Sequence, residues 1–170
     1  MTAPGATANL ATPPADYRVS YPASWVPRRQ LPRSAYLAFL AVGHASNPSC
    51  PGPLMLVRRQ QNPGGTLNQA VVAYNRVEQL RRPNRRVLAQ QPTAVQGAKE
   101  AILITATFPR TGVRGATVRS YDLLALSVRG VAFHVFASGC AADLPARFVQ
   151  RYLLSFNAAT GKPGQTAVQP

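Results

Sequence analysis

Apolar and polar positions alternate over several short stretches of this chain, and a two-residue period is typical of half-buried β-strands. Such stretches, together with short continuous apolar runs such as residues 36–42, are bounded by turn residues and predict seven strands: residues 17–21, 36–42, 53–57, 86–95, 101–108, 116–128 and 131–137. The fourth strand is expected to break or bend at Pro92, and Arg129-Gly130 is expected to form the hairpin turn between the last two. Short connections between consecutive strands predict a largely antiparallel sheet.

Two other stretches repeat apolar residues at helical spacing. The first follows turn residues 62–65, has Thr66 as its expected N-cap and ends near Arg82, before Pro83. Its apolar face is expected to comprise Leu67, Ala70, Val71, Tyr74, Val77 and Leu80. The second helix, capped by Asp143, is expected to bury Phe148, Val149, Tyr152, Leu153 and Phe156. Because each helix needs an apolar surface to cover, the order of elements predicts an α+β sandwich, with an antiparallel sheet of about six or seven strands flanked by two amphipathic helices.

The length of 170 residues and the apolar fraction of 46% suit a single domain with a substantial core, expected over residues 16–157. Residues 1–15 carry no charge and are rich in Ala, Thr and Pro, while residues 158–170 are rich in Gly, Thr, Gln and Pro. Both ends are therefore expected to be flexible. The longest apolar run, residues 35–43, is about half as long as a bilayer-spanning helix, so no transmembrane segment is expected.

Four local patterns resemble those of a known fold. Tyr21-Pro22-Ala23-Ser24-Trp25 closes the first strand, Val95-Gln96-Gly97 precedes a long strand, Arg129-Gly130 turns a hairpin, and Ser155-Phe156 ends the last helix. Over residues 17–156 the chain therefore resembles the PsbP-like fold, named after an extrinsic subunit of photosystem II and shared by the LpqN-type lipoproteins of mycobacteria. The resemblance implies an accessory protein that binds proteins, lipids or small ligands. It implies no shared active site, no cofactor and no catalytic residue.

Basic residues outnumber acidic ones by 19 to 5, and all but Lys99 and Lys162 are arginine. The net charge of +14 predicts attraction to an anionic partner. Two groups supply the candidate contact residues, namely Arg81, Arg82, Arg85 and Arg86 at the end of the first helix and Arg28, Arg29 and Arg33 in a loop. A third group comprises Arg110, Arg114 and Arg119. Arginine favours bidentate contact with phosphate or carboxylate, although a GC-rich genome alone also raises the arginine content.

Two cysteines and two histidines are the remaining candidates for chemistry. Cys50 and Cys140 are expected in loops, where they would form a disulfide in an exported protein or remain free thiols in the cytosol. His44 and His134 each lie six residues before a cysteine, a spacing unlike that of a zinc site, so we expect no metal. The five carboxylates are all distant in sequence from both histidines and are not expected to orient either one. We therefore expect no enzymatic activity.

These observations predict a non-enzymatic accessory or binding protein of a bacterial cell envelope that engages an acidic partner protein or an anionic lipid surface through arginine-rich loops. One alternative is an intracellular adaptor, assembly component or secretion chaperone, because the fold also resembles that of Eag-type chaperones. Another is a nucleic-acid-binding module, disfavoured because Tyr121 is the only aromatic residue placed beside an arginine as a stacking platform. Residues 1–15 resemble the linker after a signal peptide, so an upstream signal would indicate export and its absence a cytoplasmic location.

Overall fold

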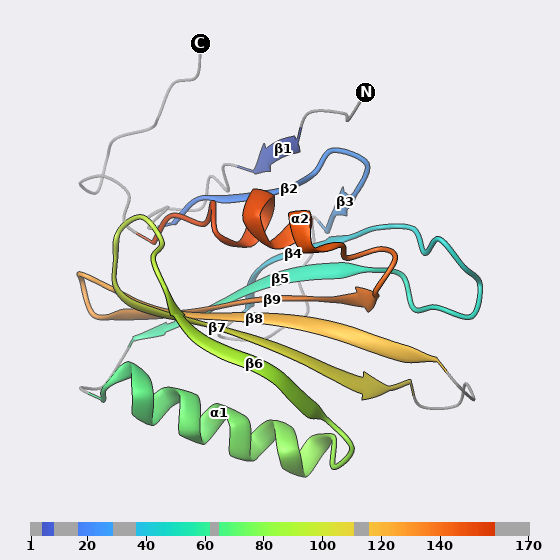
Figure 1. Ribbon diagram of the computed structural model, residues 1–170. Helices are drawn as coiled ribbons and strands as arrows, with labels where there is room; N and C mark the ends of the chain where they lie inside the picture. The colour runs from blue at the N-terminus through green and yellow to red at the C-terminus, as the bar shows by residue number, and fades with distance from the viewer. Residues whose placement is uncertain (1–4, 9–16, 29–36, 62–64, 111–115, 159–170) are drawn as a thin grey trace.

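A computed structural model describes residues 5–8, 17–28, 37–61, 65–110 and 116–158 (Figure 1). The predictions for Arg29, Arg33 and Arg114 lie outside these residues, as do those for most of the two chain ends. Within the first stretch expected to be flexible, residues Gly5–Ala8 form strand β1, which pairs antiparallel with β2 (Val19–Pro22).

The main sheet has seven antiparallel strands in the order β3-β4-β5-β9-β8-β7-β6, which confirms the predicted type and size of the sheet. The strands are β3 (Val26–Pro27), β4 (Leu37–Val42), β5 (Leu54–Gln61), β6 (Arg86–Thr93), β7 (Ala98–Pro109), β8 (Thr117–Ser127) and β9 (Val131–Cys140). The membership differs from the prediction in one respect. The first predicted strand is β2, which lies outside this sheet, and the short β3 forms the edge instead.

Local sequence signals set several boundaries of these elements. Gly130 has a φ of 77° in the turn between β8 and β9, a conformation that glycine adopts without strain. Thr66 caps helix α1 (Leu67–Arg81), and its reciprocal hydrogen bonds with Gln69 form a capping box. Strand β6 continues through Pro92 without the predicted break, because β6 is an edge strand and an edge strand tolerates a residue that lacks an N–H. The irregularity in β6 lies nearer its start, at residues 87–89.

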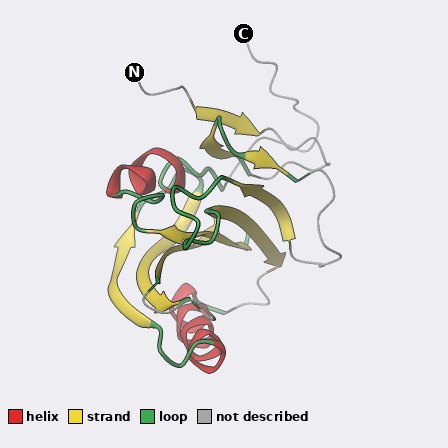
Figure 2. Ribbon diagram, turned by 90° about the vertical axis from the view of Figure 1, so that its right-hand side faces the viewer, coloured by secondary structure: helices red, strands yellow, loops and turns green. Residues whose placement is uncertain are grey.

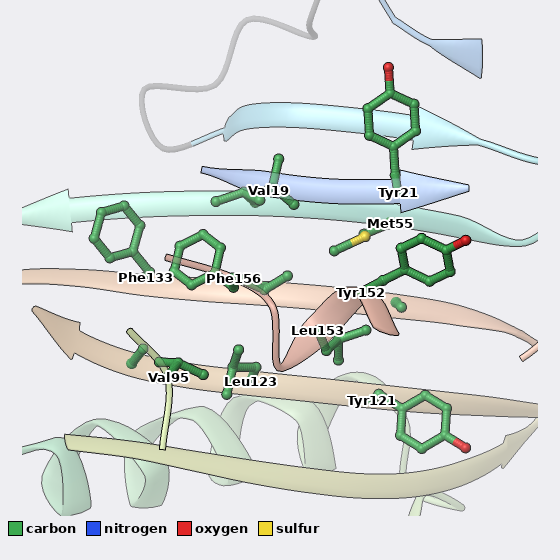
Figure 3. Close-up of a cluster of buried hydrophobic side chains, with 14 of the residues drawn as sticks. Val19, Tyr21, Met55, Val95, Tyr121, Leu123, Phe133, Tyr152, Leu153 and Phe156 are labelled. Carbon is green, nitrogen blue, oxygen red and sulfur yellow. The ribbon is translucent and has the colours of Figure 1, made fainter. Parts of the chain in front are cut away.

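One face of the sheet carries the main core, beneath β2, helix α2 (Ala146–Phe148) and the π-helical segment η1 (Val149–Leu153) (Figures 1 and 3). Its fully or almost fully buried side chains include Phe39, Met55, Leu123, Phe133, Leu153 and Phe156. The second predicted helix is thus present, but Asp143 does not cap it. The N-cap is Pro145, and the Asp143 carboxylate instead accepts a hydrogen bond from the backbone N–H of Ser46 at 3.0 Å.

Helix α1 lies on the other side of the curved sheet (Figure 2). Its buried contact with the sheet is small. Leu67 and Val71 pack with Ile104 of β7 and Leu124 of β8 in a separate cluster, against which Tyr74 and Ile102 also pack. The predicted apolar face of α1 is therefore only partly buried. Val77 is 44% exposed and Leu80 is 79% exposed. Helical spacing identifies the apolar residues but not how much sheet lies opposite them.

Cys50 and Cys140 form a disulfide, with their Cα atoms 5.8 Å apart. The bond joins the loop between β4 and β5 to the end of β9, across two strands that are neighbours in the sheet. Of the two states considered for these cysteines, the structure has the oxidised one. Among the described residues, no helix is long and apolar enough to cross a membrane.

Candidate functional site

A groove of about 570 Å³ runs along α1 on the sparsely covered face of the sheet. This α1 groove is lined by Arg58, Arg59, Ala70, Ala73, Tyr74, Val77, Glu78, Arg81, Leu124, Ala132, Phe133 and His134. It exists because α1 packs on β7 and β8, so the neighbouring part of the same face, on β9 and β5, stays uncovered by the helix.

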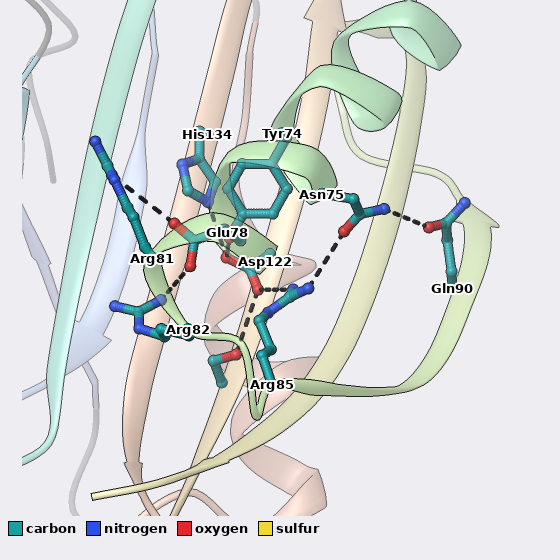
Figure 4. A network of polar contacts seen from close by, with 10 residues as sticks. Tyr74, Asn75, Glu78, Arg81, Arg82, Arg85, Gln90, Asp122 and His134 are labelled. Carbon is teal, nitrogen blue, oxygen red and sulfur yellow. Dashed lines mark hydrogen bonds and ion pairs between the residues drawn. The ribbon is translucent and has the colours of Figure 1, made fainter. Parts of the chain in front are cut away.

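The carboxylate of Asp122 lies beside the floor of the groove and is fully buried. Its Oδ1 accepts hydrogen bonds from the Tyr74 hydroxyl and from Nε2 of His134, the latter at 3.0 Å (Figure 4). Its Oδ2 accepts from the Arg85 guanidinium at 3.3 Å and from the Ser120 hydroxyl at 3.4 Å. Four donors thus satisfy one buried charge, which would otherwise be costly to remove from water.

These contacts decide which groups are ionised. Burial raises the pKa of Asp122, but the hydrogen bond and the charge of His134, the hydrogen bond from Tyr74 and the charge of Arg85 together outweigh burial and hold this pKa below its usual value. Burial, together with the charge of Asp122 and the hydrogen bond to it, raises the pKa of Tyr74 far above its usual value. The carboxylate is therefore ionised near neutral pH, and the phenol keeps the proton that it donates.

Asp122 orients His134, which corrects the expectation that no acidic residue would do so. The two residues lie on adjacent strands as diagonal neighbours, since the register pairs Asp122 with Phe136 and Leu124 with His134. The turn predicted at residues 129–130 would pair residue 128 with residue 131 and put Asp122 and His134 on opposite faces of the sheet. In the structure residues 128–130 connect β8 to β9, so the register shifts by one position and brings the two side chains to the same face. Because Nε2–H donates to the ionised Asp122, this hydrogen bond fixes the orientation of the His134 ring.

An Asp–His pair is also the orienting part of a catalytic triad. The described residues that line the α1 groove include no serine, threonine or cysteine for His134 to activate. Asp122 is also bound by Arg85 and Tyr74, so satisfaction of its buried charge accounts for the arrangement.

The predicted arginines at the end of α1 surround two buried acids. Glu78, 5% exposed, forms an ion pair with Arg82 and lies 3.9 Å from the guanidinium of Arg81, whose side chain is 63% exposed. The Arg85 side chain is only 4% exposed and bonds Asp122. Arg85 is therefore a structural residue rather than a solvent-facing contact. Arg81 extends away from α1 past Glu78 and His134 (Figure 4).

The structure groups the other arginines differently from the sequence. Arg28, at the end of β3, and Arg86, at the start of β6, are exposed but do not line the α1 groove. Arg58, outside the predicted groups, does line it and pairs in register with His134. A signal for Arg58 was present in the sequence, because an arginine pair directly continues the apolar strand at residues 54–57.

The four metal-type ligands considered from the sequence do not assemble. His134 belongs to the Asp122 network, and His44 is exposed in the loop after β4. Among the described residues, the one group close enough to share an ion is Cys50, Cys140 and Asp143, and its two sulfur atoms are joined in the disulfide. A disulfide offers no thiolate to a metal.

No known family model and no curated protein matches this chain. Solved structures do. The Ran-binding protein Mog1p of Saccharomyces cerevisiae aligns with a TM-score of 0.60 at 12% identity, over 91% of this chain and 95% of Mog1p. The cyanobacterial PsbP (CyanoP) of Synechocystis sp. PCC 6803 aligns with a TM-score of 0.54 at 12% identity, over 84% of this chain and 86% of the other.

LpqN of Mycobacterium tuberculosis, involved in cell envelope biogenesis, aligns with a TM-score of 0.53 at 13% identity, over 91% of this chain and 85% of LpqN. These likenesses confirm the PsbP-like fold expected from the sequence. At such identities they establish the fold alone, so the function has to be argued from the residues of this chain.

Proposed function

We propose that this protein is a non-enzymatic accessory protein that binds an acidic segment of a partner protein in the α1 groove. The observation that carries the proposal is the composition of the groove. It combines apolar walls, from Ala73, Val77 and Leu124, with the guanidinium groups of Arg58 and Arg81.

This combination suits a protein ligand better than a small molecule or a bare anion. Protein interfaces pair an apolar centre with a polar rim and are enriched in arginine. Val77 and Leu80 continue the apolar surface from the groove along the outside of α1, and both are exposed. A partner segment that carries apolar and acidic side chains would cover this apolar surface and neutralise the two guanidinium groups.

Two further observations support a role as an accessory protein of the cell envelope. A disulfide such as Cys50–Cys140 persists in oxidising compartments, which favours an exported protein of the cell envelope. Among proteins of the same fold, Mog1p is named for binding another protein and LpqN for a role in envelope biogenesis.

Selection from a library of random peptides displayed on phage tests the proposal. With the oxidised full chain as bait, the enriched peptides should combine Asp or Glu with large apolar residues. They should lose binding at high salt, since screening weakens contacts between exposed charges. Enrichment of peptides without acidic residues would contradict the proposal, and so would a bait that captures duplex DNA more tightly than any peptide.

Charge reversal locates the binding site. The double variant Arg58→Glu/Arg81→Glu should lose the selected peptides by at least about tenfold, because opposite charges become like charges at the contact. Arg147→Glu is the matched control, since Arg147 is exposed on α2, on the other side of the sheet. Equal loss in the control would show that net charge, and not the α1 groove, explains the binding.

A further inference from the structure

A second pocket, of about 580 Å³, lies at the turn between α1 and β6, apart from the α1 groove. Its polar lining consists of Asn84, Arg85, Arg86, Thr107 and Thr117, and its apolar lining of Pro83, Phe108 and Pro109. No carboxylate lines it within the described part of the chain. Every polar side chain here can donate a hydrogen bond, and two of them carry a permanent positive charge.

Arginines flank one of the threonines in the sheet. The register pairs Arg86 of β6 with Thr107 of β7, and Thr107 with Arg119 of β8. Directly paired residues of an antiparallel sheet place their side chains on the same face, with Cβ atoms about 5 Å apart. Arg86 and Arg119 therefore stand on either side of Thr107 on one face. Like charges so placed repel each other unless an anion lies between or beside them.

Two arginines near this turn have hydrogen-bonding capacity left over: Arg85, which lines the pocket and whose outer nitrogen bonds Asp122, and Arg119, which does not line it but pairs in register with Thr107. Nε of Arg85 and Nε of Arg119 are both buried, and neither has a hydrogen-bond acceptor among the described residues. The Arg85 side chain is 4% exposed, so this missing bond is not explained by open solvent around the side chain. Buried donors without acceptors are uncommon in folded proteins and call for a ligand or an ordered water.

The nearby acids are already engaged. Asp122 holds the outer nitrogen of Arg85, and Glu78 holds Arg82. The Arg82 guanidinium also lies 4.4 Å from the ring centre of Phe108, in the wall of the pocket, and so adds positive charge beside it. Among the described residues, neither Arg86 nor Arg119 forms an ion pair, so the positive charge at this turn exceeds the negative charge.

We infer that this pocket, the turn pocket, binds a phosphate group. A tetrahedral oxyanion accepts hydrogen bonds in several directions, which matches donors that come from a turn and from three adjacent strands. Arg86 is the exposed side chain that makes the bidentate contact, and the hydroxyls of Thr107 and Thr117 supply further donors. A planar carboxylate has only two oxygens and uses fewer of these donors.

Titration of the oxidised full chain with inorganic phosphate at low salt tests the inference. The amide resonances of Asn84, Arg86, Thr107 and Thr117 should shift and saturate, while acetate at the same concentration should shift them less. Arg86→Gln should weaken phosphate binding by at least about tenfold, the typical order for loss of one charge-assisted contact. Shifts that never saturate, or that acetate reproduces, would overturn the inference.

Two controls keep the result specific. Arg147→Gln removes an exposed arginine on the other side of the sheet and should leave phosphate binding unchanged. Arg58→Glu/Arg81→Glu should also leave it unchanged, because neither residue lines the turn pocket. If Arg147→Gln weakens binding as much as Arg86→Gln does, the effect comes from net charge and the inference is wrong. If Arg58→Glu/Arg81→Glu loses the selected peptides but still binds phosphate, the turn pocket and the α1 groove are independent sites.

The phosphate group could belong to a free ion or to a lipid headgroup. Sedimentation with phosphatidylglycerol vesicles, compared with phosphatidylcholine vesicles, distinguishes these sources. A lipid source predicts that phosphatidylglycerol vesicles carry down the wild-type chain and carry down less of Arg86→Gln. A free source predicts saturable binding of inorganic phosphate without sedimentation. The inference fails if neither form of phosphate binds in an Arg86-dependent way.

Discussion

Substitution of the buried carboxylate by an amide should destabilise the protein strongly. Asp122→Asn keeps the size of the side chain, and its oxygen can still accept from Tyr74 or His134. It removes the charge that balances Arg85, whose side chain is 4% exposed against 0% for Asp122. Loss of one partner of a buried ion pair leaves an uncompensated charge and costs about 3–5 kcal/mol. We expect the free energy of unfolding to fall by about that amount.

Urea unfolding of the single and double variants measures the effect. Arg85→Met removes the stranded guanidinium, so the double variant Asp122→Asn/Arg85→Met should be less destabilised than the sum of the two single variants. Glu100→Gln is the matched control, because Glu100 is an exposed acid on β7, and it should change stability by about 0.5 kcal/mol or less. The reasoning is refuted if Asp122→Asn behaves like this control, or if the two single effects simply add.

Three further predictions follow from the structure. The pKa of Asp122 is lower in the folded chain than in the unfolded one, so its contribution to the free energy of unfolding is present above about pH 4 and is lost as the pH falls further. The urea midpoint of Asp122→Asn should therefore drop less steeply in acid than that of the wild type. Reduction of Cys50–Cys140, which spans 90 positions, should lower the unfolding free energy by about 4–5 kcal/mol, and an unchanged urea midpoint would contradict this. Gly43→Ala would place a Cβ 2.5 Å from Nε1 of Trp25. This clash should lower the free energy of unfolding by about 1–3 kcal/mol and change the tryptophan fluorescence. An unchanged spectrum and urea midpoint would show that the Trp25 ring moves freely.

The sheet could be predicted because its signals are local. Alternation or a short apolar run marks most strands, and Gly130 marks the turn between β8 and β9. The exact register was not predicted. A two-residue turn at residues 129–130 would put Asp122 and His134 on opposite faces of the sheet, whereas the three-residue connection at 128–130 puts them on the same face, so their contact could not be predicted from the sequence.

Local signals could not predict how much of the α1 surface the sheet covers, or which arginines the buried acids bind. The helical spacing of α1 includes Val77 and Leu80, but only the packed structure shows that the buried contact of the helix is with β7 and β8 and leaves these two residues exposed. Arg85 and Arg86 are adjacent in sequence, yet the first is buried against Asp122 and the second is exposed. An arginine cluster in a sequence gives the net charge of a region, whereas the charge available to a partner depends on which acids the fold brings to it.

The same limit applies to the candidate groove. Arg58 comes from β5 and Arg81 from the end of α1, and only Arg81 belongs to a contact group predicted from the sequence. The groove arises because a short helix leaves part of a broad sheet uncovered, and that depends on the tertiary packing of elements far apart in the chain.

The proposed function requires the α1 groove to receive an acidic partner segment. Titration of the isotope-labelled chain with the tightest acidic peptide from the selection, followed by amide chemical shifts, locates that segment. The largest shifts are expected at Ala70, Ala73, Val77, Ala132 and His134, which line the groove. Largest shifts on α2 and η1 instead, with the groove amides unchanged, would contradict the proposed function.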